Sequence, residues 1–86
     1  MTTTVIDSRL RRAMQERKSD EFHLLIRVDQ IDANHEQALQ ACGMTIRRSL
    51  SLTPTYAVTG VGAAGLSLLD MPWIQRVEED GPVYAF

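Results

Sequence analysis

The chain has 86 residues, of which 44% are hydrophobic and 23% are charged, a composition typical of one small globular domain. Nine Lys and Arg residues against eleven Asp and Glu residues give a net charge of −2, which disfavours a nucleic-acid-binding protein. The single cysteine, Cys42, excludes an internal disulfide and a zinc site built from several thiolates. No apolar run is long enough to span a membrane, and residues 1–7 do not resemble a secretory signal. We therefore expect a cytoplasmic protein, if the chain is complete, that does not contact membranes.

An amphipathic helix is predicted over residues 7–18. Thr4 or Asp7 can cap it, and Leu10 and Met14 are spaced to share its apolar side. The opposite side is basic, and we interpret it as a solvated surface rather than a docking site for an acidic partner. The residues that make it basic are Arg9, Arg11, Arg12, Arg17 and Lys18.

Alternating apolar residues predict the first strand at residues 22–28, with Leu24 and Ile26 on its buried face. Asp32 can cap the next helix, and Gly43 has the position of a glycine that ends it. The remaining pattern predicts strands at residues 44–50, 56–61 and 73–78, and helices at residues 33–42 and 63–70.

The second predicted strand also follows a simple alternation. Met44 and Ile46 are expected to face the core, and Thr45, Arg47 and Ser49 are expected to face outward.

After the N-terminal helix, the order of elements is strand, helix, strand, strand, helix, strand. With right-handed crossovers this order predicts a ferredoxin-like βαββαβ fold of the α+β class. A four-stranded antiparallel sheet would carry two helices on one face, with the N-terminal helix as an extra element. The other face would be solvated, covered by the N-terminal helix, or used for binding.

The chain shows no set of residues suited to catalysis or to a cofactor. Two histidines, His23 and His35, are too few for a metal site and are interpreted as surface residues. The glycine-rich segment 60–65 follows a strand and opens a helix, as in a dinucleotide fingerprint, but no parallel βαβ unit accompanies it. We interpret its glycines as room for a tight turn, and we expect neither enzymatic activity, nor a metal, nor a cofactor.

Residues 73–80 (WIQRVEED), followed by residues 83–86 (VYAF), resemble the end of the subtilisin propeptide, the peptidase inhibitor I9 family. Segments 23–29, 41–46, 56–58 and 68–72 fit earlier parts of the same family pattern. The likeness covers about residues 22–86 and is most specific over 72–80. It divides the chain into an N-terminal helical extension (1–21), a propeptide-like domain (22–80) and a C-terminal inhibitory tail (81–86).

This resemblance implies an inhibitor, and also a folding chaperone, of a subtilisin-like serine protease, acting in trans, or in cis if a longer precursor exists. The helix-free face of the sheet would lie on two protease helices, whose N-termini Glu78 and Asp80 would cap. The tail would occupy the substrate cleft like a cleaved product, with Phe86 in the S1 pocket. The three preceding tail residues, Val83, Tyr84 and Ala85, would fill the next subsites.

Elementary chemistry agrees with these roles. A carboxylate at a helix N-terminus meets free N–H donors and a partial positive charge. An extended tail can pair with cleft strands through its backbone. The sequence departs from the family in Gly81 and Pro82, which replace a pair resembling His-Val, and in the N-terminal helix.

Two other functions fit a ferredoxin-like order. An ACT-like regulatory module would sense a small ligand near residues 60–65 and dimerise through its sheet edges. An RNA-binding sheet would need paired aromatic residues on its strands and a basic charge, and the sequence has neither.

Overall fold

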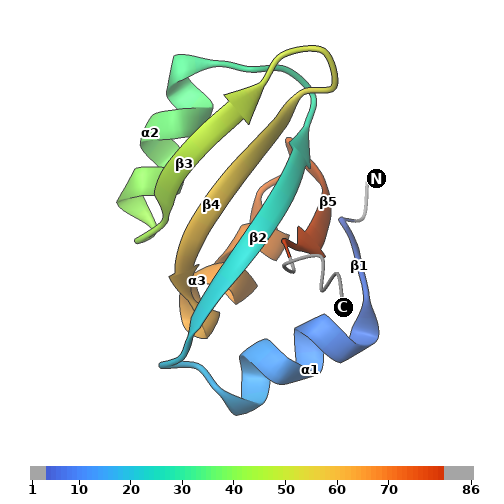
Figure 1. The fold of residues 1–86 in the computed structure, drawn as a ribbon, viewed down its shortest axis with the longest axis vertical. Coiled ribbons are helices and arrows are strands. Elements are labelled where there is room, and N and C mark those ends of the chain that lie inside the picture. The colour runs from blue at the N-terminus through green and yellow to red at the C-terminus, as the bar shows by residue number, and fades with distance from the viewer. Residues whose placement is uncertain (1–3, 81–86) are drawn as a thin grey trace, which may run out of the picture.

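The computed structural model describes residues 4–80 (Figure 1). Its strands are β1 (Val5–Ile6), β2 (Glu21–Val28), β3 (Thr45–Leu50), β4 (Thr55–Val61) and β5 (Ile74–Glu79). Its α-helices are α1 (Ser8–Glu16), α2 (Ala33–Ala41) and α3 (Gly62–Ser67), and a short 3₁₀ helix, η1 (Leu68–Asp70), follows α3. The chain is therefore of the α+β class.

The strands form one mixed sheet of five strands in the order β1-β5-β2-β4-β3. All neighbouring pairs are antiparallel except β1 and β5, which are parallel. The expectation of four strands was wrong because residues 5 and 6 pair with β5 beside the start of helix α1. The hydroxyl of Thr4 donates to the carbonyl oxygen of Ile74 at 2.9 Å and so holds this segment against β5.

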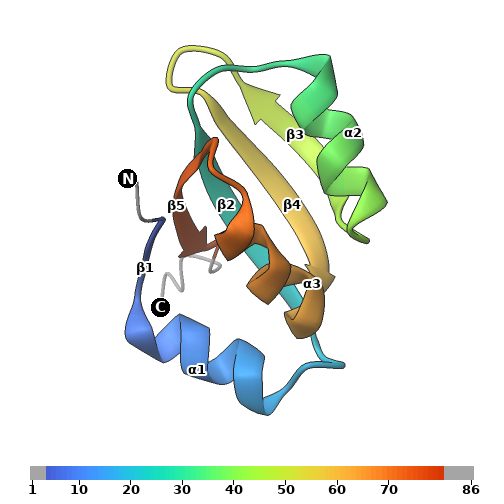
Figure 2. The same cartoon turned by 180° about the vertical axis from the view of Figure 1, so that it is seen from behind.

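Helices α2 and α3 lie on one face of the sheet, as the view from behind in Figure 2 shows. Helix α1 runs beside the lower end of the sheet in Figure 1 and contacts α3. Its residues Leu10 and Met14 are buried in the same core as the sheet residues, whereas Arg9, Arg11 and Arg12 are exposed. The predicted apolar and basic sides of this helix are therefore confirmed.

The core confirms the alternation predicted for the first long strand. Phe22, Leu24, Ile26 and Val28 of β2 are all buried, and they meet apolar residues from the helices and the other strands. The largest of these partners are Tyr56, Met14, Leu39, Leu68 and Ile74.

The ends of helix α2 are formed by the residues that the sequence suggested. The side chain of Asp32 accepts a hydrogen bond from the Asn34 backbone N–H at 2.7 Å. Gly43 follows the helix with φ of +100°, a conformation that side chains other than glycine rarely adopt. At the other predicted cap, Asp7 precedes α1 without a side-chain hydrogen bond.

Strand β3 departs from the predicted alternation. A β-bulge between Ile46 and Arg48 shifts its register, so that Arg48 pairs with Ala57 and Ser49 pairs with Tyr56. Ser49 therefore lies on the side of the sheet that carries the helices, and the expectation that it faces outward was wrong. Arg48 and Leu50 take the outward positions instead.

Candidate protein-docking face

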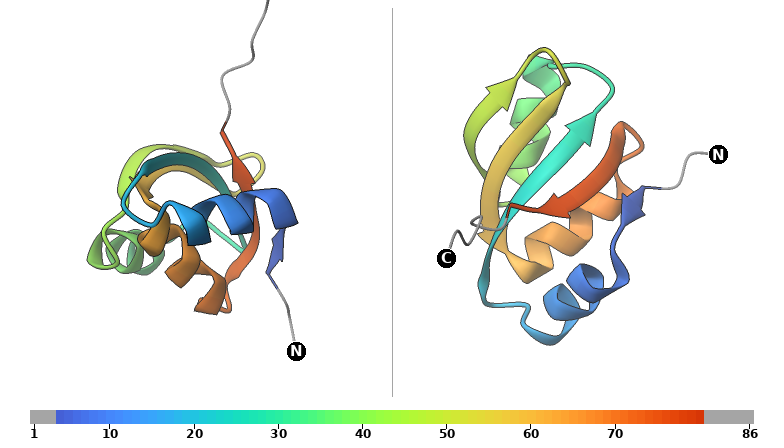
Figure 3. Two further views of the ribbon diagram at one scale, coloured as in Figure 1. Left: turned by 90° about the horizontal axis from the view of Figure 1, so that it is seen from below. Right: turned by 45° about the vertical axis from the view of Figure 1, so that its right-hand side comes forward.

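The sheet has one face on which no helix of the described part of the chain lies (Figure 3, right). Strand register places side chains from four strands there in rows, because directly paired residues share a face. One row runs across Leu50, Thr55, Arg27 and Arg76, and the next runs across Arg48, Ala57, Leu25 and Glu78. We call these eight residues, together with His23, Arg47 and Asp80 beside them, the helix-free face.

Two carboxylates predicted to cap protease helices lie on this face. Glu78 pairs in register with Leu25, and Asp80 continues the strand, since its backbone N–H donates to the His23 carbonyl oxygen at 2.8 Å. Asp80 borders a hollow of about 300 Å³ together with Arg47, Arg48 and Ala57. Glu79 pairs with buried Leu24 and therefore belongs to the opposite side of the strand.

Glu78 has an ion-pair partner within the chain. Its Oε2 lies 3.3 Å from Nη1 of Arg76, and the two side chains are 53% and 50% exposed. A pair this exposed contributes little to stability, because water and salt screen it. Glu78 can therefore exchange this partner for another at a small free-energy cost.

A second hollow of about 340 Å³ opens on the helix-free face. It lies between β2, β5 and the residues that flank the turn from β3 to β4. Its lining combines apolar and charged side chains, namely Leu25, Leu50, Thr55, Arg27, Arg76 and Glu78. Leu50 is 44% exposed, which leaves an uncovered apolar surface at its rim.

Arg47 lies in the β-bulge of β3, and its side chain extends across the sheet to contact β2. Its Nη1 lies 2.9 Å from Nδ1 of His23, so this ring nitrogen accepts the hydrogen bond when it carries no proton. The Nε2 atom of the same ring lies 3.6 Å from Oε1 of Glu21. His23 is thus a surface residue, as predicted, in contact with charged neighbours.

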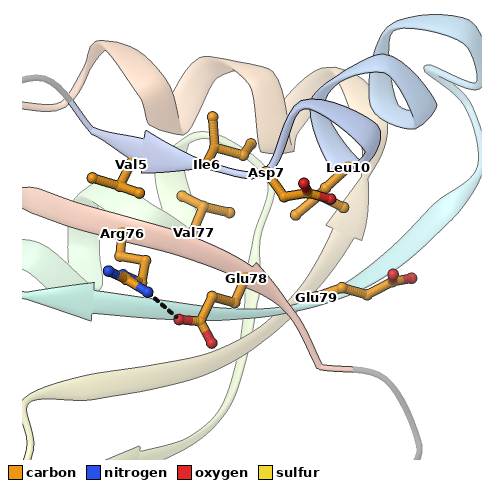
Figure 4. Close-up of a pocket in the computed structure, with 8 residues that line it drawn as sticks. All are labelled: Val5, Ile6, Asp7, Leu10, Arg76, Val77, Glu78 and Glu79. Carbon is orange, nitrogen blue, oxygen red and sulfur yellow. Dashed lines mark hydrogen bonds and ion pairs between the residues drawn. The ribbon is translucent and has the colours of Figure 1, made fainter.

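A groove of about 320 Å³ runs along the other side of β5, between that strand and the β1–α1 segment (Figure 4). Ile6, Leu10 and Val77 give it an apolar wall, and Figure 4 shows Arg76 and Glu78 projecting from β5 away from that wall. The sequence alone did not predict this groove, because one of its sides is formed by β1, which was not expected as a strand.

The predicted tail residues Val83, Tyr84, Ala85 and Phe86 lie outside the described residues, as do Gly81 and Pro82. The described chain ends at Asp80, which belongs to the helix-free face.

The glycine-rich segment packs closely against its own chain. A Cβ atom at Gly62 would lie 2.7 Å from the carbonyl oxygen of Arg17 and 2.8 Å from that of Met14. A Cβ atom at Gly60 would lie 2.5 Å from the sulfur of Met44. The expected tight strand-to-helix turn is present, since β4 ends at Val61 and α3 begins at Gly62, and the lack of side chains at Gly60 and Gly62 also allows these close contacts.

His35 and Cys42, which could in principle bind a metal ion, contact other residues of the fold instead. The ring of His35 stacks on Trp73 with centroids 4.0 Å apart, and its Nε2 lies 2.8 Å from Oδ1 of Asp29. The Cys42 thiol donates to the Leu39 carbonyl oxygen at 3.1 Å, at the end of helix α2. Among residues 4–80, no three His, Cys, Asp or Glu side chains gather closely enough to hold a metal ion.

No helix in the described part of the chain combines the length and apolar character needed to cross a membrane. Comparisons of the chain with family models, with curated proteins and with solved structures return no match.

Proposed function

We propose that this protein inhibits a subtilisin-like serine protease by docking its helix-free face on the enzyme and inserting residues 83–86 into the active site as a product mimic. The same docking would let it assist folding of the protease. The enzyme supplies all catalytic groups, and the inhibitor supplies a rigid platform and a tail.

The arrangement of the sheet supports this proposal. Without β1, the strand order is β5-β2-β4-β3, with α2 following β2 and α3 following β4. This is the order of a ferredoxin-like βαββαβ fold, which the resemblance to subtilisin propeptides implies. We propose that β1 and α1 are additions to that fold at the edge beside β5, where register places exposed Val5 next to Arg76 at the border of the helix-free face.

The observation that carries the proposal is the position of Glu78 and Asp80. Both belong to the helix-free face, and Asp80 is the last residue before the segment that leads into the tail. A partner seated on this face would meet the two carboxylates and then the tail in sequence. Each carboxylate could accept hydrogen bonds from free N–H groups at the start of a protease helix.

The first test is a titration of the intact chain against a panel of purified subtilisin-like proteases that cleave after aromatic residues. We expect competitive inhibition of at least one of them. A chain shortened to end at Pro82 should lose this inhibition, because it lacks the residues that would occupy the cleft. Equal inhibition by the shortened and intact chains would overturn the tail mechanism, and inhibition of no protease would overturn the proposed function.

Single substitutions in the acidic triplet test the docking geometry. Glu78→Ala and Asp80→Ala should each raise the inhibition constant about 2- to 30-fold, by analogy with helix N-caps worth about 0.5–2 kcal/mol. Glu79→Ala removes an equal charge from the opposite side of the strand and is the matched control. It should leave the inhibition constant nearly unchanged.

A further inference from the structure

Arginine residues are concentrated on the helix-free face, although the whole chain is weakly acidic. Arg27, Arg47, Arg48 and Arg76 supply four of the nine Lys and Arg residues of the sequence. Within residues 4–80, only Arg76 of these four forms an ion pair with a carboxylate. The face therefore carries positive charge that the described part of the molecule does not neutralise.

Two of these arginines are direct neighbours in the sheet. Arg27 on β2 and Arg76 on β5 are register partners, so their side chains leave the same face from adjacent positions. Like charges placed directly opposite each other destabilise a sheet. The Arg76–Glu78 pair offsets only part of this repulsion, since Arg27 has no carboxylate within 4.0 Å among the described residues. An external carboxylate seated between the two guanidinium groups would remove it.

The same two arginines flank an apolar surface. Together with half-buried Leu25 and exposed Leu50, they line the hollow of about 340 Å³, which has room for an aliphatic side chain. Thr55 and Glu78 complete the lining, and Glu78 lies on the Arg76 side, where the two form their ion pair. A ligand that fits this site has a negative group beside an apolar group.

We propose that this hollow recognises an Asp or Glu side chain of the protease, held between Arg27 and Arg76, together with an aliphatic side chain held against Leu25 and Leu50. On a helix, residues three or four positions apart are neighbours on one side, so one protease helix could present both groups. This inference rests on the proposed function, because it takes the protease as the partner, and it adds the chemistry of the protease surface.

A protein surface fits this face better than a nucleic acid does. Glu78 and Asp80 interrupt the row of arginines, whereas a run of backbone phosphates needs continuous positive charge. The strand residues that register places on this face include no Phe, Tyr or Trp on which bases could stack.

The test measures the affinity of Arg27→Gln and Arg76→Gln for a protease that the intact chain inhibits, at low and at moderate salt concentration. Each substitution should raise the dissociation constant about 5- to 30-fold and weaken its salt dependence, because it removes one of the two guanidinium groups that hold the protease carboxylate. Arg12→Gln is the matched control. It makes the same change on the exposed side of α1 and should bind like the unmodified chain.

Measurements of stability show whether a variant loses affinity because recognition is lost or because its fold is damaged. Arg27→Gln should leave the urea midpoint of the free chain unchanged or raised, since it removes the repulsion with Arg76. Inhibition with unchanged affinity for both arginine variants would overturn this inference and leave the proposed function standing. If no protease is inhibited, both this inference and the proposed function are overturned. Tight binding of a 20-nucleotide single strand that Arg27→Gln abolishes would also overturn it, by assigning the face to nucleic acid.

Discussion

Tyr56 is the residue that ties strand β4 to the first turn of helix α2. Its side chain is fully buried, and its hydroxyl accepts the Asp32 backbone N–H at 3.1 Å. The same hydroxyl lies 3.0 Å from Oε2 of Glu36 and 3.2 Å from the Asp32 carbonyl oxygen, and it can donate its proton to either. Burial raises the pKa of Tyr56. The hydrogen bond with the Asp32 backbone lowers it, and Glu36 raises it further.

Replacement of Tyr56 by Phe is expected to lower the free energy of unfolding by about 1–3 kcal/mol near pH 7. The substitution removes the hydroxyl and leaves half-buried polar groups of Asp32 and Glu36 without this partner. Chemical denaturation with urea measures the change. A loss below about 0.5 kcal/mol would mean that water replaces the hydroxyl.

The same substitution predicts a difference in pH dependence. Because the pKa of Tyr56 is raised in the folded chain, its contribution to stability is complete below the pKa of the unfolded chain, about 10. Above that pH the unfolded state loses the proton first, so the folded state loses stability as pH rises towards the folded pKa. The stability gap between wild type and Tyr56→Phe should therefore narrow as pH rises above about 10. A constant gap would contradict the raised pKa.

At the scale of elements, helix α1 is joined to the rest of the molecule by its apolar side. Met14 is fully buried, Leu10 is 6% exposed, and the helix contacts α3 next to the closely packed Gly62. This helix has a structural role in the core, in addition to any role of its basic side.

Met14→Ala should lower the free energy of unfolding by about 2–4 kcal/mol, because it removes buried methylene groups and the thioether and leaves a cavity. Gln15→Ala on the exposed side of the same helix is the control and should change stability by less than about 0.5 kcal/mol. Thermal or urea unfolding of both variants gives the comparison. Equal stabilities would mean that α1 is a detachable extension.

The elements differ in how far their sequences predict them. Strand β2 alternates without interruption, and one buried face determines which side each residue takes. Strand β3 alternates only over its first residues. Arg47, Arg48 and Ser49 are three polar residues in a row, and the bulge lies where the alternation breaks and turns Arg48 and Leu50 outward. Strand β1 has only two residues, and it forms because β5 offers it a free edge.

The candidate site likewise contains one part that the sequence predicts and one part that it does not. Alternation along one strand is enough to separate Glu78 from Glu79, and so the acidic pair could be predicted from sequence. The proximity of Arg27 and Arg76 depends on the register between strands nearly 50 positions apart, which the pattern of either strand alone does not contain. The arginine pair and the hollow beside it therefore could not be predicted from the sequence.

At the scale of the whole molecule, stability should decrease from the centre of the sheet to its edges. β2 is bonded to a neighbour on both sides, and its four inward side chains lie in the core. β1 is a two-residue edge strand, and five of the six residues of β3 at the other edge are exposed. A domain of this size buries a modest share of its surface, so its outer elements can open without global unfolding.

Native-state hydrogen exchange should follow this order. The backbone amides of Leu24 and Ile26 in β2 should exchange only through global unfolding, and their opening free energies should match the value from urea denaturation. Amides of β1 should exchange fastest among the strands, and those of β3 should be intermediate, because β3 keeps a long antiparallel partner in β4. Protection of Ile6 equal to that of Leu24 would show that β1 and the sheet unfold as one unit. In that case the N-terminal segment would be as integral to the fold as the central strand, and the proposal that it is an addition to a ferredoxin-like fold would be overturned.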